Sequence, residues 1–302
     1  MRNLWLLLFL AACGGGGGGG GGSPSPTLPA PVVTPDRPPS TSPVTSPATP
    51  IVGLGTHSLG YEAINELGML RVRYTRFTMY AALWELSESY RAEWTAGLAL
   101  AFSHGLKVLV VVHALPPHWT GDDFGRFMGD RALEFGPMLE GFQLGNEIPF
   151  GDGSPASHAH FHTSAYHAIK SVSRDTKVVT MAMPDSAFPV LLQSTNLPTD
   201  AYAVHLYGYP LSGVTKRLRK WISANVPVWV TEVGIEQKVI PPDAGPWEQI
   251  QARELRDAVD AGHGYARIYI YQLRTFDGEL HGLLRDDGTL RPAAEWLASR
   301  SR

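Results

Sequence analysis

Eight apolar stretches recur along the chain after residue 50, and they constrain its fold more than any other feature. Each is rich in β-branched or other apolar residues and has the length of a β-strand. The stretches are Ile51–Gly55, Leu70–Tyr74, Leu106–Val112, Gly141–Gly145, Lys177–Met183, Ala201–Tyr207, Val226–Glu232 and Arg267–Gln272. We predict that each of them forms a strand.

Segments of helical composition lie between several of these stretches, namely Ser89–His104, His158–Ser173, Val214–Ala224 and Trp247–Gly262. Strands that alternate with helical crossovers form parallel sheets. The uninterrupted apolar run Val108–Val112 is typical of a strand that is covered on both faces. Residues 51–302 also have the usual size of a (β/α)8 barrel. We therefore predict an α/β fold, a TIM barrel that forms a single domain over residues 51–302.

A doubly wound open sheet is the alternative fold. Many such sheets carry a glycine-rich phosphate loop after the first strand. Here Gly53-Leu54-Gly55-Thr56-His57 lacks the later glycine of a dinucleotide-binding fingerprint. This difference favours the barrel.

The N-terminus has the pattern of an export signal. Arg2 precedes the apolar run Leu4–Leu10, which is too short to span a bilayer. Leu10-Ala11-Ala12-Cys13 resembles the lipobox of bacterial lipoproteins, in which the cysteine is lipidated after cleavage. A chance cysteine after an ordinary signal peptide would leave a lone thiol in an oxidising compartment, because Cys13 is the only cysteine. We predict a signal peptide over residues 1–12 and lipidation of Cys13.

A low-complexity segment follows Cys13. Residues 14–22 are all glycine, and residues 23–50 are mostly proline, serine and threonine, so neither part can form a core. We predict a disordered tether over residues 13–50 that links the folded domain to the lipid. The protein would then be extracytoplasmic and anchored to the bacterial cell envelope, at the outer membrane if the cell is Gram-negative.

The charge pattern restricts the class of ligand. The formal net charge is -3, and no long run of either sign occurs in the chain. Nucleic acid and anionic membrane surfaces are therefore poor candidates for the main partner, and a neutral polar ligand fits better. With 44% hydrophobic residues, the chain has enough apolar material for one sizeable core.

Two glutamates close apolar strands, Glu147 after the fourth and Glu232 after the seventh. In a TIM barrel the active site lies at the carboxyl ends of the strands. Alternation along the seventh strand predicts that Glu232 lies on the same face as Val228 and Val230. Two carboxyl groups in one pocket suit the cleavage of a glycosidic bond, which needs a proton for the leaving oxygen and an anion for the sugar carbon.

With these strand positions, the sequence resembles glycoside hydrolase clan A, a superfamily of retaining barrels whose Asn-Glu ends strand four and whose nucleophile ends strand seven. The resemblance covers nearly the whole domain. It implies that Glu147 is the acid/base, that Asn146 binds the sugar 2-hydroxyl and that Glu232 is the nucleophile. It also implies a carbohydrate substrate and a reaction that requires no cofactor.

Further positions are similar to clan residues. The segment that ends in Arg73 resembles the second strand of cellulase-type members, whose arginine lies beside the nucleophile and keeps it ionised. His113 matches a histidine that lines the site, although a packing role is an equal alternative. His205-Leu206-Tyr207 resembles the clan's His-x-Tyr, whose tyrosine contacts the nucleophile.

The end of the chain combines one likeness with one departure. The segment Gly282–Ala293 resembles a stretch that follows strand eight in many members and has a structural role there. Many relatives also end strand eight with a tryptophan under the cleaved sugar, whereas Tyr271-Gln272-Leu273 stands here. The family within the clan therefore remains open.

Several aromatic residues and histidines could contact a ligand. The candidates for stacking on sugar rings are Trp84, His118, Trp119 and Tyr209, of which we select Trp119, while loop packing is an equal alternative for each. His158, His160 and His162 are two residues apart, and on a helix this spacing does not bring all three to one face. We assign no metal site.

The sequence therefore predicts a retaining glycosidase that hydrolyses O-glycosyl compounds. A transglycosylase with the same site is one alternative, and a carbohydrate-binding envelope lipoprotein without activity is another. We expect a monomer whose contact with the membrane is made through its lipid anchor only.

Overall fold

The computed structural model describes residues 50–147, 150–184, 197–208, 226–235, 237, 240, 245–262, 265–275 and 281–300. They belong to one compact unit, Pro43–Arg302. The predicted signal peptide, Cys13 and the tether up to residue 49 lie outside the described residues. The same holds for the predicted helix Val214–Ala224 and for Tyr209.

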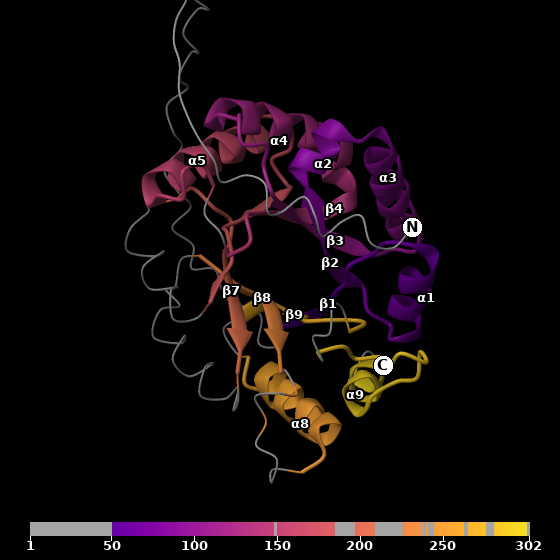
Figure 1. Ribbon diagram of the computed structural model, residues 1–302. Helices are drawn as coiled ribbons and strands as arrows, with labels where there is room; N and C mark the ends of the chain where they lie inside the picture. The colour runs from indigo at the N-terminus through magenta and orange to yellow at the C-terminus, as the bar shows by residue number, and fades with distance from the viewer. Residues whose placement is uncertain are drawn as a thin grey trace, which may run out of the picture. The chain divides into compact units, whose positions relative to one another are not determined.

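A parallel β-sheet forms the centre of this unit (Figure 1). Its described strands are β1 (Ile51–Gly55), β2 (Tyr74–Tyr80), β3 (Lys107–His113), β4 (Leu139–Leu144), β5 (Lys177–Val179), β6 (Met183–Pro184), β7 (Tyr202–Tyr207), β8 (Val228–Gly234) and β9 (Tyr265–Ile270). Neighbouring strands follow the order β5-β4-β3-β2-β1-β9-β8-β7-β6, and their pairings are parallel. The first strand of the chain thus pairs with the last, as a barrel requires.

The two edges of the sheet meet at the fifth predicted strand, which is divided into β5 and β6. β5 pairs with β4, and β6 pairs with β7. Between them, Val179 forms a parallel bridge with Ala201, and the Thr180 amide donates to the Ala201 carbonyl at 3.1 Å. These contacts close the sheet into the predicted TIM barrel.

The second strand begins later than predicted. Leu70 is the C-cap of the helix α1 (Tyr61–Met69), and the amide of Val72 donates to the carbonyl of Leu67 at 3.0 Å. Leu70 and Val72 are buried because they pack at the end of this helix, not because they lie in the sheet. β2 therefore starts at Tyr74. The other strands agree with the predicted stretches to within a few residues.

The described helices lie on the outer side of the sheet (Figure 1). Besides α1 they are α2 (Ala81–Leu86), α3 (Glu88–Ser103), α4 (Gly121–Phe135), the 3-10 turn η1 (Gly136–Met138), α5 (Pro155–Val172), α8 (Trp247–Asp260) and α9 (Pro292–Arg300). Side chains at the amino ends of three helices satisfy free backbone amides: Ser87 caps α3, Thr120 forms a capping box on α4, and Ser154 caps α5. None of the described helices is long and apolar enough to cross a membrane.

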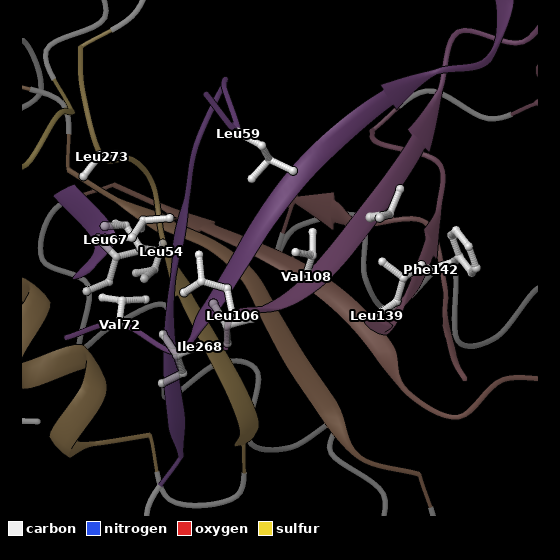
Figure 2. Packing of buried hydrophobic residues seen from close by; sticks show 14 of the residues in the cluster. Leu54, Leu59, Leu67, Val72, Leu106, Val108, Leu139, Phe142, Ile268 and Leu273 are labelled. Carbon is white, nitrogen blue, oxygen red and sulfur yellow. The ribbon is translucent and has the colours of Figure 1, made fainter. Parts of the chain in front are cut away.

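Apolar side chains fill the space between the sheet and the helices, where Figure 2 shows Leu54, Val108, Phe142 and others from several strands. A second cluster contains Leu109, Ala203, Trp229 and Tyr269 and fills the inside of the barrel. Along β3, Val108 and Val110 belong to the first cluster, and Leu109 between them belongs to the second. This alternation is expected for a strand that is covered on both faces.

A partly buried ion pair lies near the amino ends of the strands. Arg267 forms an ion pair with Glu140, and the hydroxyl of Tyr269 donates to the same carboxylate. The guanidinium also lies over the rings of Tyr74 and Trp229. This end of the barrel is therefore filled, and the opposite, carboxyl end carries the polar residues described below.

Candidate active site

Polar side chains from β2, β4, β7 and β8 meet at the carboxyl end of the barrel. Arg76 comes from β2, and His205 and Tyr207 come from β7. Glu232 comes from β8, and Glu147 follows β4. Residues far apart in the sequence thus form one cluster, because parallel strands bring their carboxyl ends together.

A β-bulge turns Glu232 toward this cluster. Val230 pairs with Val204, but the next pair of the register is Glu232 with His205, so Thr231 is an extra residue in β8. Val228 and Val230 belong to the outer core, whereas Trp229 belongs to the barrel interior. The prediction that Glu232 shares a face with the two valines is therefore wrong.

Glu232 is buried among groups that stabilise its charged form. Arg76 Nη1 lies 2.6 Å from Glu232 Oε1, and the hydroxyl of Tyr207 donates to Oε2. His205 Nε2 lies 3.4 Å from Oε1. Burial raises the pKa of Glu232, but Arg76 first, and then His205 and Tyr207, outweigh it, so the pKa lies below the ordinary carboxyl value. The group is a carboxylate at neutral pH.

Tyr207 keeps its proton. Burial first, and then the charge of Glu232, raise the pKa of Tyr207 well above its ordinary value. The hydroxyl can therefore act as a donor to Glu232 throughout the pH range of most enzymes. The contact between the tyrosine of His-x-Tyr and the predicted nucleophile is present in the structure.

Arg76, not Arg73, is the arginine beside Glu232. Arg73 precedes β2 and is exposed, while Arg76, three residues further along, is buried. The prediction was wrong because β2 starts at Tyr74. Arg76 Nη2 also donates to Asn146 Oδ1 at 2.7 Å, and its Nε donates to Gln143 Oε1 at 3.2 Å. Three acceptors thus fix the orientation of one guanidinium.

Glu147 leaves β4 in an unusual conformation and reaches solvent. Its backbone φ is 60°, in the left-handed region, and its amide donates to the Ala182 carbonyl at 3.0 Å. Its side chain is 43% exposed, whereas the side chain of Glu232 is 9% exposed. His205 Nδ1 lies 2.7 Å from Glu147 Oε1. The two carboxyl groups therefore contact opposite nitrogens of the same imidazole.

His113 lies at the end of β3 beside the same cluster. Burial lowers its pKa, the charge of Arg76 lowers it further, and the charge of Glu147 acts in the opposite direction. The imidazole is neutral near pH 7. Its ring packs edge-on against Tyr80 at a centroid distance of 6.3 Å. His113 also lines a cavity of about 190 Å³ together with Trp119, so the structure brings these two predicted residues together.

The sequence did not predict a role for Gln143, and it indicated Tyr271 only as a departure from the clan's tryptophan. Gln143 is fully buried, and its amide nitrogen donates to the Gly145 carbonyl at 2.8 Å, just before Asn146. Tyr271 follows β9, where many clan members have tryptophan, and its ring packs edge-on against Tyr207 at 5.9 Å. The sequence signal that could have indicated Gln143 is a glutamine within an apolar strand.

Trp84 and His118, two other candidates for stacking on sugar rings, contact protein side chains. Trp84 is buried against Trp94 and Phe135, so it cannot stack on a sugar. His118 is exposed, 3.5 Å from Glu85.

The three histidines of α5 divide between two faces of the helix. His158 and His162 are buried, and His160 is exposed. Within the described ranges, no group of three or more histidine, cysteine, aspartate or glutamate side chains is arranged to hold a metal ion.

The segment after β9 packs as a structural element. Leu283 and Leu284 are buried, and their amides donate to the carbonyl of Leu273 at 3.1 and 3.0 Å. Arg291 lies over the ring of Trp247 at 4.6 Å. The segment therefore joins the end of β9 to α8.

The second half of the chain is similar to a known protein family. Residues 170–296 match the family model described as "Glycosyl hydrolase catalytic core". The matched residues include His205, Tyr207 and Glu232. A comparison with curated protein sequences gave no match.

Three solved structures that share this fold carry names of glycosidases. The catalytic domain of an endoglucanase from Thermobifida fusca superposes with a TM-score of 0.62 at 17% identity, over 84% of this chain and 92% of the other. A family 1 β-glucosidase from Thermotoga maritima gives a TM-score of 0.64 at 12% identity, over 84% and 97%. The catalytic domain of the major endoglucanase from Xanthomonas campestris pv. campestris gives 0.60 at 15% identity, over 84% and 93%.

These structures belong to the clan that the sequence resembles. At such identities the likeness shows the fold, which is the TIM barrel. Together with the match to the glycosyl hydrolase core, it supports a glycosidase that hydrolyses O-glycosyl compounds.

Proposed function

We propose that this protein is a retaining glycoside hydrolase in which Glu232 is the nucleophile and Glu147 is the acid/base. The observation that carries the proposal is the difference between the two glutamates. Glu232 is buried, held by Arg76 and Tyr207 and ionised, whereas the side chain of Glu147 is exposed. A fixed anion and an accessible proton donor are the two groups that the double-displacement reaction needs.

The first step transfers the sugar to the enzyme. A carboxylate oxygen of Glu232 attacks the anomeric carbon, and the bond from this carbon to the leaving oxygen breaks. Glu147 gives its proton to that oxygen, so the leaving group departs as a neutral alcohol. The anomeric centre is inverted once, and the sugar is bound to Glu232 as an ester.

The second step releases the sugar. Glu147, now a carboxylate, takes a proton from a water molecule, whose oxygen attacks the anomeric carbon. The ester bond to Glu232 breaks, and the carboxylate returns to its ion pair with Arg76. The second inversion restores the original configuration.

The substrate belongs to the class of β-linked glycosides. The solved structures of the same fold carry the names endoglucanase and β-glucosidase, and this supports a β-linkage. Asn146 is held by Arg76 at 2.7 Å, so its position beside Glu147 is fixed and suits contact with the sugar 2-hydroxyl.

The test is a screen of aryl β-glycosides and β-linked polysaccharides with the purified protein, with NMR detection of the first anomer released. The proposal expects the β-anomer first. Release of the α-anomer first would overturn the retaining mechanism. Added acceptor sugars distinguish hydrolysis from transglycosylation, because a transglycosylase would form longer products in place of free sugar.

The location is part of the same proposal. The export signal, the lipobox-like Leu10-Ala11-Ala12-Cys13 and the glycine-rich segment support an enzyme that is lipidated at Cys13. It would act on the extracytoplasmic side of the cell envelope, and the membrane would be contacted through the lipid alone.

A further inference from the structure

The ring of Tyr207 packs against two rings from the segment that follows β9. The ring centroid of His281 lies 5.5 Å from that of Tyr207 and 5.5 Å from that of Tyr271, and both contacts are edge-on. Tyr271 in turn lies 5.9 Å from Tyr207. Each of the three rings therefore contacts the other two. Tyr207 is the member whose hydroxyl donates to Glu232.

His281 is buried and its backbone is fixed to the barrel. The residue is 6% exposed, and its carbonyl accepts a hydrogen bond from Gln251 Nε2 of α8 at 2.9 Å. Two residues later, the amide of Leu283 donates to the carbonyl of Gln272 at 3.0 Å, directly after β9. These bonds hold the segment against α8 and β9, so the imidazole ring has a defined position beside Tyr207.

Gly234 leaves the space for this contact. It ends β8, two residues after Glu232. A Cβ atom at residue 234 would lie 3.0 Å from Tyr207 Cε1 and 3.1 Å from His281 Nδ1. These distances are shorter than the optimal separation of about 3.5 to 4.0 Å between non-bonded carbon atoms. Gly234 does not have a positive φ, so the close approach of the two rings, and not the backbone conformation, favours glycine here.

The position of the Tyr207 ring determines the direction of its hydroxyl. The hydroxyl oxygen lies on the axis of the ring, so a tilt of the ring moves the donor away from Glu232. Hydrogen bonds weaken steeply as their geometry departs from linear. Arg76 from β2 and His205 from β7 face the same carboxylate, and together with Tyr207 they lower the pKa of Glu232. A misplaced Tyr207 ring would remove one of these three contacts and leave the other two.

We propose that His281 is a positioning residue of the active site, whose ring holds the ring of Tyr207 so that the hydroxyl points to Glu232. Gly234 is part of the same arrangement, because it admits both rings. The inference rests on the proposed function where it concerns catalysis, since it takes Glu232 as the nucleophile. It adds a supporting residue from outside the strands, which acts through Tyr207 and does not contact the substrate.

The test is a double-mutant cycle between His281 and the hydroxyl of Tyr207. Tyr207→Phe keeps the ring and should lower kcat/KM on an aryl β-glycoside by about 10- to 100-fold, because a hydrogen bond to a charged group is lost. His281→Ala should lower it by roughly tenfold, because the same bond is misaligned. In the Tyr207→Phe background, His281→Ala should add less than about a twofold loss. An equal loss in both backgrounds would overturn the proposal.

Two further variants accompany the cycle. Gly234→Ala pushes on the same two rings from β8, so it should lower kcat/KM in the wild type and have little effect in the Tyr207→Phe background. It gives a result even if His281→Ala does not fold. His167→Ala is the matched control, because His167 is exposed on α5 and packs edge-on against Tyr166 at 5.6 Å. Its kcat/KM should equal that of the wild type, and wild-type activity of folded Gly234→Ala and His281→Ala would contradict the proposal.

The pKa of Glu232 separates this inference from the proposed function. NMR titration of protein labelled at the glutamate carboxyl carbons measures this pKa, and Glu232→Gln identifies its signal. Tyr207→Phe and His281→Ala should both raise the pKa of Glu232, whereas His167→Ala should leave it unchanged.

The titration has two outcomes that distinguish the claims. A raised pKa in His281→Ala, without hydrolysis of any glycoside by the wild type, would overturn the proposed function and support the contact between His281 and Tyr207. Hydrolysis with retention by the wild type, but an unchanged pKa of Glu232 in folded His281→Ala, would overturn the positioning role and leave the glycosidase standing.

Discussion

Arg76 connects the two functional halves of the site at the scale of single residues. It pairs with Glu232 at 2.6 Å and holds Asn146, the neighbour of Glu147, at 2.7 Å. The guanidinium also donates from Nε to Gln143 Oε1, which is its third acceptor. The charge of Arg76 is also the largest of the effects that oppose the burial of Glu232. One side chain thus determines both the ionisation of the predicted nucleophile and the position of a predicted sugar contact.

Replacement of Arg76 by methionine should therefore change the pH dependence. Arg76→Met removes the positive charge that holds the pKa of Glu232 below its ordinary value, so this pKa should rise. Glu232 would then be protonated over part of the acidic range. The acid limb of the profile of kcat/KM against pH should move to higher pH.

Arg73→Met is the matched control for this experiment, because Arg73 lies three residues earlier and is exposed. Its profile on an aryl β-glycoside should match that of the wild type. An unshifted acid limb in Arg76→Met would show that Glu232 does not depend on this arginine.

The effect of replacing Glu147 should depend on the leaving group of the substrate. Glu147→Ala removes the proton donor, so glycosides of poor leaving groups should lose about 10² to 10⁴-fold in kcat. An activated dinitrophenyl glycoside needs no proton and should form the glycosyl-enzyme at nearly the wild-type rate. Presteady-state release of dinitrophenol measures this step, and an equal loss on both classes of substrate would argue against Glu147 as the acid.

At the scale of elements, irregularities in the strands position the site. The extra residue Thr231 in β8 turns Glu232 inward. The break between β5 and β6 places the Ala182 carbonyl where it accepts the amide of Glu147. Regular strands would place these groups on other faces or in other registers, because each added residue reverses the direction of the next side chain.

The same irregularities mark the limit of prediction from the sequence. Apolar stretches indicated the order of the strands, and the last residues of those strands indicated Glu147, His205, Tyr207 and Glu232, which the structure brings together. Alternation could not predict the bulge at Thr231, because no residue type is diagnostic of an extra residue in a parallel strand. Arg76 was missed because the buried Leu70 and Val72 resemble the start of a strand, although they pack against the end of α1.

The buried histidines of α5 should make stability depend on pH. Burial lowers the pKa of His162 to about 4 from its ordinary value of 6.5. A folded-state pKa that is depressed in this way means that the unfolded chain binds the proton more readily. The contribution of the neutral His162 to the free energy of unfolding is complete above pH 6.5, and it is lost as the pH falls from 6.5 toward 4. It amounts to roughly 3 kcal/mol at most.

His162→Gln can still donate a hydrogen bond to the Pro198 carbonyl, which His162 Nε2 contacts at 3.0 Å, but it does not titrate. The loss of unfolding free energy between pH 7 and pH 4.5 should therefore be smaller in this variant than in the wild type. Urea denaturation at the two pH values measures the difference. His160→Gln, on the exposed side of α5, should keep the wild-type dependence, and an equal dependence in both variants would contradict the argument.

At the scale of the whole molecule, the two ends of the barrel have different roles: the amino end is structural, and the carboxyl end carries the candidate active site. The ion pair of Arg267 with Glu140 fills the amino end, and the titratable groups of the site lie at the carboxyl end. The chain before residue 50 contributes to location rather than to catalysis in our proposal. Activity and membrane attachment should therefore change independently.

Replacement of the predicted lipidation residue tests this independence. Cys13→Ser should abolish lipidation and move the full chain from the membrane fraction to the soluble extracytoplasmic fraction, because the tether has no other cysteine to modify. The kcat/KM of the protein on an aryl glycoside should stay at the wild-type value. Unchanged fractionation of the variant would eliminate the lipid anchor at Cys13.

The roles of the two glutamates are the central claim, and the stereochemistry of azide products tests it most directly. In Glu147→Ala, Glu232 still attacks an activated aryl β-glycoside first, and azide then releases the sugar as the β-glycosyl azide. In Glu232→Ala, azide attacks the sugar itself and gives the α-glycosyl azide. NMR of the isolated products distinguishes the two anomers. We expect opposite anomers from the two variants; the same anomer from both, or full activity of Glu232→Ala without azide, would contradict the assignment.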